Sequence, residues 1–453
     1  MAATTTLDLD WSGDALSRHD DPRPGVIVVL LAGVPVCAAE PLGPGDVLSL
    51  GRGQAFGTLR LEDGWMSRHH VQIRRRVDGW EVADAGSRNG TAVDGVVLDG
   101  PVRVRTGPRL VRAGTSLFLL RDDIRPFQAT PVGEGDDIVV GPTLATVFAD
   151  IARASRFGGT LHIVGESGVG KELAARAFHQ LGPRSAGPFV AVNCAAIPEG
   201  VAERLLFGAR KGAFSGADAH ADGYVQAAAG GTLFLDEIAE LDAAVQAKLL
   251  RVLENREVLP LGAARPVPVD LHICSATHRD LRVEAAAGRI REDLYFRLSR
   301  PEVAVPPLRE RVEEIPLLVD RALRDLPGGL SAHASLVEAC MLRQWPGNVR
   351  ELVAEVRSAG QAAVAEGVVV VEERHLLDDA GRPLGSTQEQ PAARAGRGQP
   401  TREAIEEILR AEAGNVSSSA RALGLHRTQL RRLMARFGLD ARDFAPEGSP
   451  AES

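Results

Sequence analysis

A glycine-rich loop between an apolar run and a helix is the feature that most constrains this chain. The loop, Gly165-Glu-Ser-Gly-Val-Gly-Lys171, follows the strand-like residues 161–164 and precedes a helical stretch. Glycines here let backbone N–H groups turn inward around phosphate oxygens, and the helix N-terminus adds its dipole. Lys171 then reaches the β- and γ-phosphates. The sequence therefore predicts an α/β domain that binds a nucleoside triphosphate.

Two carboxylates at the end of a second apolar run supply the catalytic half of such a site. The run is Leu233-Phe-Leu-Asp236-Glu237. Asp236 is placed to hold Mg²⁺, and Glu237 to polarise the attacking water. Between residues 141 and 377, strand-like runs alternate with helical stretches and end in a helical part. This pattern indicates an α/β nucleotide-binding fold followed by a helical lid.

Length and charge set the wider organisation. A chain of 453 residues is long enough for roughly three domains. The hydrophobic fraction of 44% and the charged fraction of 25% are those of globular proteins, which argues against a mainly disordered, fibrous or membrane protein. The net charge of −8 excludes a chain that is basic throughout, so any nucleic-acid contact must come from a local patch.

The cysteines and the N-terminal region bear on the compartment. The four cysteines show neither zinc-ligand spacing nor the spacing of a disulfide framework, which fits a reducing cytoplasm. The longest uncharged apolar run, residues 25–39, is too short to span a bilayer. We therefore expect a cytoplasmic protein with no membrane segment.

The regions before and after the ATPase differ in their pattern of apolar residues. Short β-branched runs broken by turn signals predict an all-β sandwich before the ATPase, and a small all-α unit closes the chain. We expect a multi-domain chain with a disordered tail at 1–25, the sandwich at 26–121, a linker at 122–137, the ATPase with its lid at 138–377, a flexible linker at 378–400, the helical unit at 401–440 and a tail at 441–453.

The central region resembles the AAA+ domain of bacterial enhancer-binding proteins, the activators of sigma-54 RNA polymerase. Its phosphate loop ends in Lys171-Glu172, which is this family's own version of the motif, whereas Ser or Thr is usual after the lysine elsewhere. The sensor II arginine of the lid is matched by Arg350 in Trp345-Pro-Gly-Asn-Val-Arg350. The resemblance implies ATP binding by Gly165, Glu166, Ser167, Gly168, Val169, Gly170, Lys171, Glu172, Asp236 and Arg350.

The same resemblance assigns residues around the catalytic carboxylate. Asn193 matches the asparagine that restrains the catalytic glutamate, which is Glu237 here. Thr277 falls at sensor I, and His278 follows it where Asn is common. These matches imply a catalytic group of Glu237, Asn193 and Thr277.

Two arginines match the family's arginine fingers. Arg291 and Arg297 lie in Arg291-Glu-Asp-Leu-Tyr-Phe-Arg297. In the family such residues reach into a neighbouring subunit's site, where a guanidinium neutralises charge developing on the γ-phosphoryl group. Fingers that act between subunits imply a homo-oligomeric ring, a hexamer by analogy.

A second loop in this region resembles the GAFTGA loop that contacts sigma-54. Small residues flank Phe214, which predicts a mobile tip carrying a hydrophobic anchor. Ser215 stands where Thr is usual; it keeps the hydroxyl and loses a methyl, so we expect retained but weaker coupling. The expected contact residues are Gly212, Ala213, Phe214, Ser215, Gly216 and Ala217.

The strand-rich region carries three motifs that resemble the forkhead-associated (FHA) domain, which binds phosphothreonine peptides. The motifs are Gly51-Arg52, Ser67-Arg68-His69-His70 and Ser87-Arg88-Asn89-Gly90. Arg52 and Arg68 can make charge-assisted contacts to a phosphate, Ser67 offers a hydroxyl, and Asn89 an amide for the peptide backbone. In this family the histidine at position 70 braces the loops rather than contacting the ligand.

The C-terminal unit resembles the Fis-type helix-turn-helix. Five arginines and no acidic residue lie between Arg421 and Arg436, so the unit is basic although the whole chain is acidic. Residues at the start of its third helix suit phosphate and base-edge contacts with double-stranded DNA. The expected contact residues are Arg427, Thr428, Gln429, Arg431 and Arg432.

Together these patterns favour a sigma-54-dependent transcription activator that uses ATP and Mg²⁺. Its signal input would be a threonine-phosphorylated protein, a Ser/Thr kinase or self-phosphorylated protomers, in place of the phospho-acceptor receiver domain common in the family. Two alternatives remain open. One is a DNA-binding AAA+ regulator that acts with another sigma factor, and the other is a phosphopeptide-dependent scaffold whose ATPase is degenerate.

Overall fold

The computed structural model describes two compact units, one within residues 1–384 and one within 385–453. In the first unit the described residues are 21–383 apart from 106, 130–131, 136–137, 199 and 214–218. In the second they are 402–412, 419, 430, 434, 437–439 and 444. Within this described part, no helix combines the length and the apolar character that crossing a membrane requires.

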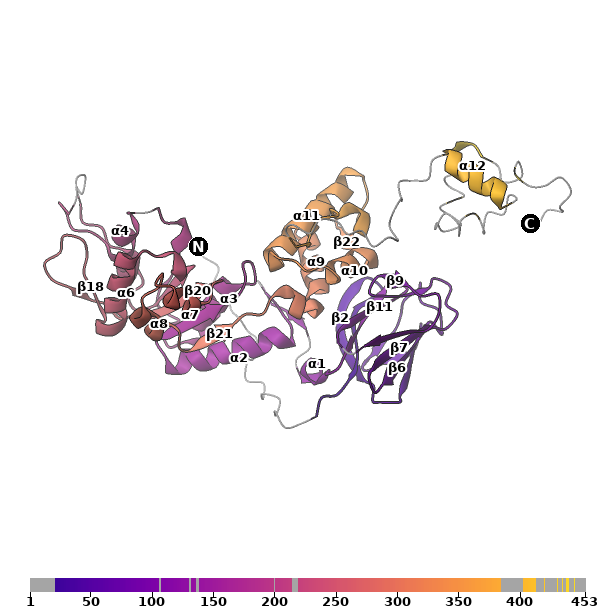
Figure 1. Ribbon diagram of the computed structural model, residues 1–453, viewed down its shortest axis with the longest axis horizontal. Coiled ribbons are helices and arrows are strands. Elements are labelled where there is room, and N and C mark those ends of the chain that lie inside the picture. The colour runs from indigo at the N-terminus through magenta and orange to yellow at the C-terminus, as the bar shows by residue number, and fades with distance from the viewer. Residues whose placement is uncertain are drawn as a thin grey trace. The chain divides into compact units, whose positions relative to one another are not determined.

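The N-terminal region forms the expected β-sandwich (Figure 1). One sheet has the order β2-β1-β12-β11-β8-β9 and faces a second sheet with the order β10-β7-β6-β3, while β4 and β5 form a separate hairpin. The strands are β1 Gly25–Leu31, β2 Val34–Pro41, β3 Val47–Leu50, β4 Ala55–Phe56, β5 Leu59–Arg60, β6 Val71–Arg76, β7 Gly79–Asp84, β8 Thr91–Val93, β9 Val96–Val97, β10 Val102–Arg105, β11 Arg109–Ala113 and β12 Ser116–Arg121.

The sandwich core lies between its two sheets. Phe118 packs edge-on against Phe56 at 6.0 Å between ring centroids, and Trp80 is 1% exposed. Strands β1 and β12 are buried along nearly their whole length, not at alternate positions. A continuous apolar run is typical of a strand that is buried on both faces. The residues of β1 and β12 that point away from the sandwich core belong to a separate core, which is described below.

The residues after the sandwich contain more structure than a linker. The helix α1 Arg125–Ala129 and the two-stranded pair of β13 Gly133–Glu134 and β14 Val139–Val140 lie there. Ile124 and Phe127 of this connector are buried. Their apolar side chains explain the difference from the expected linker at 122–137, because burying them stabilises local order.

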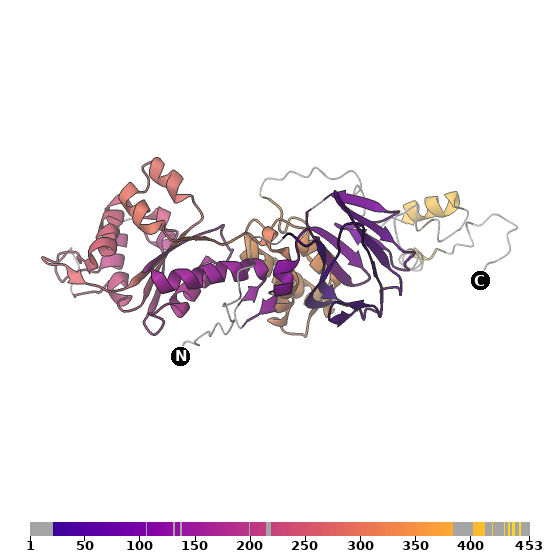
Figure 2. The same ribbon diagram turned by 90° about the horizontal axis from the view of Figure 1, so that it is seen from below.

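The central domain is a parallel five-stranded sheet with the order β16-β17-β20-β15-β21, as predicted for an α/β nucleotide-binding fold. Its strands are β15 Thr160–Val164, β16 Phe189–Asn193, β17 Thr232–Asp236, β20 His272–Thr277 and β21 Glu302–Ala304, and β18 Glu257–Val258 and β19 Val267–Pro268 form a separate antiparallel pair. The helices are α2 Pro142–Phe157, α3 Lys171–Leu181, α4 Ala202–Phe207, α5 Tyr224–Ala227, α6 Ala243–Asn255, α7 Leu281–Ala286 and α8 Glu292–Leu298 (Figure 2). Short 3-10 turns lie at Cys194–Ala196 and Ile238–Glu240.

A helical lid follows the sheet. It consists of α9 Ile315–Arg324, α10 Ala334–Met341 and α11 Asn348–Ala365, with the short parallel pair β22 Ser331–Ala332 and β23 Val370–Val371 and 3-10 turns at Leu308–Glu310, Val312–Glu314 and Glu373–His375. The lid extends past residue 377. Ala380 is 5% exposed, and the N–H of Gly381 donates to Glu351 Oε1 at 2.9 Å. The expected flexible linker at 378–400 therefore begins several residues too early, because its first residues still pack on α11.

The C-terminal unit contains the helix α12 Arg402–Ala411. Ile405 and Leu409, one helical turn apart, share a small core with Leu430 and Met434. On the exposed face of the same helix, Glu406 pairs with Arg402 and Arg410. The predicted DNA-contacting residues Arg427, Thr428, Gln429, Arg431 and Arg432 lie outside the described residues.

Candidate functional site

The glycine-rich loop connects β15 to α3 at the carboxyl edge of the sheet. Lys171 begins α3 and is only 7% exposed. Its Nζ donates to the carbonyl oxygens of Gly165 at 2.9 Å and Glu166 at 3.3 Å. The lysine charge is thus held inside the loop, at the place where the motif predicts the phosphates of a nucleotide.

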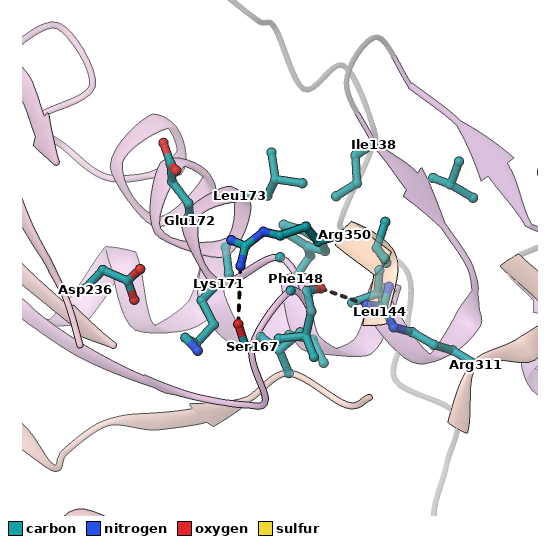
Figure 3. A pocket seen from close by; sticks show the side chains of 18 of the residues that line it. Ile138, Leu144, Phe148, Ser167, Lys171, Glu172, Leu173, Asp236, Arg311 and Arg350 are labelled. Atoms are coloured by element: carbon teal, nitrogen blue, oxygen red, sulfur yellow. Dashed lines mark hydrogen bonds between the residues drawn. The ribbon is translucent and has the colours of Figure 1, made fainter. Parts of the chain in front are cut away.

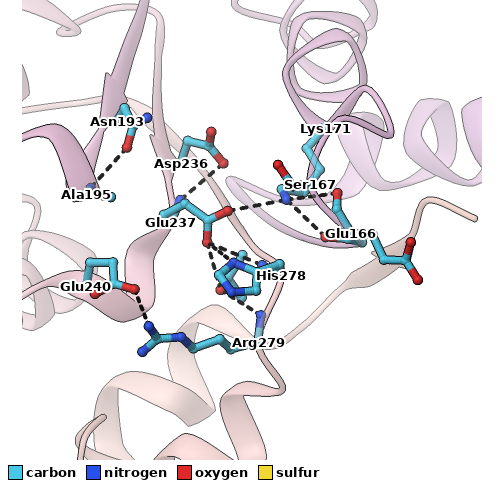
Figure 4. A network of polar contacts seen from close by, with 12 residues as sticks. Glu166, Ser167, Lys171, Asn193, Ala195, Asp236, Glu237, Glu240, His278 and Arg279 are labelled. Atoms are coloured by element: carbon cyan, nitrogen blue, oxygen red, sulfur yellow. Dashed lines mark hydrogen bonds and ion pairs between the residues drawn. The ribbon is translucent and has the colours of Figure 1, made fainter. Parts of the chain in front are cut away.

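Glu237 lies at the centre of a polar network at the end of β17 (Figure 4). Its Oε1 is 3.5 Å from Lys171 Nζ, and its Oε2 is 2.8 Å from His278 Nδ1 and 3.4 Å from Thr277 Oγ1. Burial acts to raise the pKa of Glu237, but the hydrogen bond from His278 and the charge of Lys171 outweigh it and hold the pKa below its usual value. Glu237 is therefore ionised and oriented at neutral pH, as a residue that orients water requires.

Asn193 has a different contact from the one that the resemblance implies. Its Oδ1 accepts a hydrogen bond from the N–H of Ala195 at 3.0 Å, so that it caps the turn after β16 (Figure 4). Asn193 still lines the cavity that Glu237 lines. In this arrangement the side chains that contact Glu237 are Lys171, Thr277 and His278, and His278 makes the shortest of these contacts at 2.8 Å. The sequence places His278 where Asn is common but does not assign it to the site.

Asp236 differs electrostatically from its neighbour. Burial raises its pKa, and the charge of Lys171 offsets this only in part. Its Oδ1 accepts from the N–H of Glu237 at 3.1 Å. A carboxylate desolvated in this way is stabilised by a nearby cation, which is the property expected of a group that binds a metal.

Lys171, Asn193, Asp236 and Glu237 line one cavity of about 370 Å³ (Figure 3). One end is polar and carries the loop residues 167–172 with Asn193, Asp236 and Glu237. The other end is apolar, and its walls are Ile138, Val139, Leu144, Val147, Phe148, Leu318 and Val349. A polar end for phosphates next to an apolar end for a flat ring system is suited to a nucleotide.

The lid contacts the phosphate loop through Arg350, Asn348 and Arg309, and through Arg311, which is described below. Arg350 donates to Ser167 Oγ at 3.2 Å (Figure 3). Asn348, which is fully buried, donates to the carbonyl oxygen of Ser167 at 3.0 Å and to Glu166 Oε2 at 3.1 Å. Arg309 forms a bidentate pair with Glu166 at 2.9 and 2.7 Å, and this contact lowers the pKa of that carboxyl. Side-chain hydrogen bonds and an ion pair therefore join the lid directly to the phosphate loop.

Close packing explains one glycine of the loop. Gly168 has φ +77°, and a Cβ added there would lie 2.2 Å from the carbonyl oxygen of Gly347 in the lid. Both the backbone conformation and the approach of the lid exclude a side chain. The sequence motif alone attributes this glycine to the phosphate, whereas the structure adds the lid as a second reason.

Arg311 is a buried residue at this site that sequence reasoning missed. It is 2% exposed. Its guanidinium donates to the carbonyl oxygen of Val169 in the loop at 2.7 Å and to Glu314 at 2.7 Å. No local signal identifies it, because the partner in the loop is 142 positions away.

The predicted arginine fingers lie away from the cavity of their own chain. Arg291, which precedes α8, pairs with Asp293 at 2.7 Å, and Arg297 pairs with Glu254 at 3.4 Å. Neither lines the cavity. Of the predicted sigma-54 loop only Gly212 and Ala213 belong to the described residues; Phe214, Ser215, Gly216 and Ala217 lie outside them.

The loops of the sandwich bring the predicted phosphothreonine residues together. The N–H of Arg52 donates to the carbonyl oxygen of Ser67 at 2.9 Å, and Asn89 Nδ2 donates to the carbonyl oxygen of Trp65 at 2.7 Å. Buried His70 bridges two of the loops, since its Nδ1 accepts from the N–H of Ser67 at 3.0 Å and its Nε2 lies 3.1 Å from the carbonyl oxygen of Gly90. His70 thus braces the loops, as expected.

A third arginine, Arg88, belongs to this cluster. Its N–H donates to Ser67 Oγ at 3.1 Å. Arg52, Arg68 and Arg88 are all exposed, and within the described part of the chain none of them forms an ion pair. The loop that carries Arg88 is fixed by Asp84, which accepts hydrogen bonds from Ser87 and Thr91.

Comparison with known proteins agrees with this geometry. Three family models match in order: the FHA domain over residues 33–111, the sigma-54 interaction domain over 138–304 and the bacterial regulatory protein Fis family over 402–437.

Two relatives and one solved structure extend the comparison. The transcriptional regulatory protein GlrR of Escherichia coli is 41% identical over 62% of this chain and 63% of its own length. The nitric oxide reductase transcription regulator NorR1 of Cupriavidus necator is 38% identical over 73% of this chain and 70% of its own length. The crystal structure of NtrX from Brucella abortus in complex with ATP matches with a TM-score of 0.50 and 30% identity, covering 68% of this chain and 70% of that one.

The chain spans less than two thirds of GlrR, and the three matched regions follow one another as the sequence predicts. The central domain has the AAA+ ATPase fold, with the loop, the strand-end carboxylates and the lid arginine around one cavity. The chain therefore belongs to the family of sigma-54-dependent transcriptional regulators, with an FHA domain, a sigma-54 interaction domain of the AAA+ fold and a Fis-type helix-turn-helix in that order.

Proposed function

We propose that this protein activates transcription by sigma-54 RNA polymerase. It would bind an upstream DNA site through residues 402–437 and use ATP hydrolysis to remodel the closed promoter complex. The observation that carries this proposal is the assembly of Lys171, Asp236, Glu237 and Arg350 around one cavity in a chain whose central region matches the sigma-54 interaction domain.

The residues divide the work of hydrolysis. Backbone N–H groups of the loop and Lys171 bind the β- and γ-phosphates. Glu237, ionised and held by His278 and Thr277, orients the attacking water. Arg350, which reaches the loop from the lid, senses the γ-phosphate and links its loss to lid movement.

The residues present fit Mg²⁺. Among the described residues, no group of three or more His, Cys, Asp or Glu is placed to hold a metal alone. Mg²⁺ commonly binds through one or two carboxylates together with nucleotide phosphates, and desolvated Asp236 at the polar end of the cavity is such a carboxylate. Bound there, Mg²⁺ would supply charge neutralisation at the phosphates.

Completion of the site by a second subunit accounts for the finger arginines. Arg291 and Arg297 lie outside their own cavity with side chains 46% and 60% exposed. Exposed guanidiniums are available to a neighbour, where they would neutralise charge on the γ-phosphoryl group. We propose a homo-oligomeric ring, a hexamer, as the active form.

The sandwich would provide the signal input. Arg52, Arg68 and Arg88 are exposed; Arg68 follows Ser67 in sequence, and the backbone N–H groups of Arg52 and Arg88 donate to Ser67. A phosphothreonine dianion can receive charge-assisted hydrogen bonds from such a group, and Asn89 can hold the peptide backbone beside it. The proposed ligand is a threonine-phosphorylated protein, either a separate partner or its kinase.

Reconstituted transcription tests the proposal. A sigma-54 promoter, sigma-54 polymerase and the full chain should give open complexes only with ATP. Lys171→Ala should abolish them, whereas Lys248→Ala, which removes a lysine of α6 that pairs with Glu203 outside the cavity, should not. No ATP-dependent open complex with the wild type, or equal activity of both variants, would refute the function.

A second variant separates remodelling from hydrolysis. Phe214→Ala should keep ATP hydrolysis and lose engagement of sigma-54, because it removes the expected hydrophobic anchor of the loop and leaves Lys171, Asp236 and Glu237 unchanged. Unaltered sigma-54 engagement would contradict this role of the loop. Activity of the wild type with a different sigma factor in the same assay would favour the alternative regulator instead.

A further inference from the structure

The outer face of the sandwich and the lid share one hydrophobic core. Ile27 of β1 and Leu119 of β12 belong to the same cluster as Val319 of α9 and Val337 of α10. All four are 2% exposed or less. The FHA domain is therefore packed on the lid through the second face of its larger sheet, and this face is distinct from the loops that carry Arg52 and Arg68.

Two partly desolvated ion pairs cross this contact. Arg112 of β11 pairs with Glu338 of α10 at 2.6 Å, and Arg121 at the end of β12 pairs with Glu313 at 2.7 Å. The Glu313 side chain is 1% exposed and that of Glu338 is 9%. Burial raises the pKa of both carboxyls, against the opposing charge of the arginines. A buried carboxylate without its arginine would be strongly unfavourable, so each pair favours the docked position of the sandwich.

Only one of these pairs connects to the phosphate loop. Glu313 is followed by Glu314, which is fully buried, accepts from the N–H of Gly141 at 2.8 Å and pairs with Arg311 at 2.7 Å. Arg311 donates in turn to the carbonyl oxygen of Val169 in the phosphate loop at 2.7 Å. The route from the sandwich to the loop is thus continuous, with the peptide link between Glu313 and Glu314 as one step, and Glu313, Glu314 and Arg311 are each 3% exposed or less.

The two arginines also differ in their own surroundings. Arg121 lies over the ring of Phe127 in α1, with its guanidinium carbon 5.8 Å from the centroid. This contact gives the guanidinium a second partner besides Glu313. Glu338, the partner of Arg112, lies on α10, and no residue of α10 lines the nucleotide cavity.

We propose that Arg121 is a positioning residue for the nucleotide site. Docking of the FHA domain on the lid sets ATP affinity, and Arg121 carries this effect through Glu313 and the Glu314–Arg311 pair to the carbonyl of Val169. The inference rests on the proposed ATP site. It assigns the FHA domain a direct route to the phosphate loop, separate from any effect on assembly.

The test compares two matched variants of the full chain. Arg121→Gln and Arg112→Gln each remove one arginine from the same interface, and each leaves one buried carboxylate. We expect the Kd of a fluorescent ATP analogue, mant-ATP, to rise about fivefold or more for Arg121→Gln, the lower range of measured site-to-site coupling, and less than about twofold for Arg112→Gln. An equal rise in both, or no rise in either, would overturn the proposed route.

Two further measurements keep the test decisive if Arg121→Gln is poorly folded. Arg121→Lys keeps a cation and should retain most of the affinity. The double variant Arg121→Gln/Glu313→Gln removes the charge that is left unpaired, so its Kd should be closer to wild type than the sum of the single effects predicts. Additive effects would contradict coupling through this pair.

Failure of the inference is distinguishable from failure of the proposed function. If the wild type does not bind mant-ATP, the ATP site itself is wrong. If the wild type binds and hydrolyses ATP but Arg121→Gln matches Arg112→Gln, only the route through Glu313 is wrong. In steady-state kinetics the expected change is in KM for ATP with little change in kcat, because Arg121 contacts no cavity residue.

Discussion

The nucleotide cavity and the sandwich loops hold their cationic side chains in opposite ways. Lys171 is 7% exposed and donates to two carbonyl oxygens of its own loop. Arg52 and Arg68 are exposed, and in the part of the chain that the structure describes they form no ion pair. One site is built in advance by the protein, and the other leaves its charges for a ligand to pair.

This difference follows from burial. A buried charge must be paired or hydrogen-bonded within the protein, so the buried cavity cations Lys171 and Arg311 are tied to carbonyl oxygens and, for Arg311, to Glu314. An exposed guanidinium is hydrated and needs no internal partner. We therefore expect the cavity to respond to substitutions that break its internal contacts, and the sandwich loops to respond to charge and salt.

The largest expected effect is on hydrolysis at the buried site. Glu237→Gln keeps the shape of the side chain but removes the carboxylate that His278 and Thr277 orient. ATP hydrolysis should fall by about 10²- to 10⁴-fold, the usual contribution of a positioned acid or base, while mant-ATP still binds. A coupled phosphate-release assay measures the loss. Glu240→Gln, which alters a nearby carboxylate paired with Arg279 (Figure 4), should change the rate little.

Retention of hydrolysis in Glu237→Gln would show that the network around this carboxylate is structural. The cavity could then no longer be contrasted with the sandwich loops as a pre-formed catalytic site.

The next largest effect is on the exposed site. Arg68→Ala removes a guanidinium that no described residue neutralises. The affinity of the full chain for a phosphothreonine peptide should fall about 10- to 100-fold, as expected for one charge-assisted hydrogen bond. Isothermal titration calorimetry measures it. Arg103→Ala removes an exposed arginine of the same sandwich that is already paired with Glu81, and serves as the matched control.

Equal affinity of the Arg68→Ala and wild-type proteins, with peptide binding intact, would mean that other residues bind the phosphate. If the wild type itself does not prefer a phosphothreonine peptide over the same peptide without phosphate, the sandwich is a docking domain only.

The sequence alone predicts those parts of the two sites that are built from residues close together in the chain. The phosphate loop and the pair Asp236-Glu237 are short contiguous motifs whose geometry is fixed by one strand and one turn. The lid–loop contacts were out of reach, because Arg311 and Val169 are 142 positions apart. The pairing of His278 with Glu237 depends equally on two strands being neighbours in the sheet.

The apolar runs of the sandwich carry a further signal of its surroundings. Strands β1 and β12 consist of nearly unbroken apolar residues, whereas a strand with one face in water shows alternation. The unbroken runs indicate that something covers the outer face of the sheet. The covering element, the lid, could not be identified this way, because an apolar face carries no information about its partner.

A smaller effect is expected for stability at acidic pH. His162 of β15 is fully buried beside Ser275, and burial lowers its pKa to about 4. In the unfolded chain its pKa is about 6.5, so the unfolded state binds the proton first as the pH falls. The contribution of neutral His162 is present above that value and is lost progressively towards the folded pKa.

Urea unfolding checks this sign. The free energy of unfolding should fall by about 1 kcal/mol more between pH 8 and pH 5.5 in the wild type than in His162→Gln, which does not titrate. Because both proteins contain the other titrating groups, the pH dependence of those groups cancels when the two free energies of unfolding are subtracted. His69→Gln changes an exposed histidine of the sandwich and should follow the wild type. Parallel pH profiles for wild type and His162→Gln would contradict the buried neutral state.

The smallest expected effect separates the two sites by their response to salt. Between about 50 mM and 500 mM NaCl the Debye length falls from above 10 Å to a few ångströms. Exposed arginines are screened over this range, so the Kd for the phosphothreonine peptide should rise about threefold. Lys171 is shielded within its loop, and the Kd for mant-ATP should change less. If the two Kd values depended equally on salt, the phosphate of the peptide and those of mant-ATP would meet their cations in similar surroundings. The exposure of Arg52 and Arg68 in the unliganded sandwich would then not distinguish the two bound states.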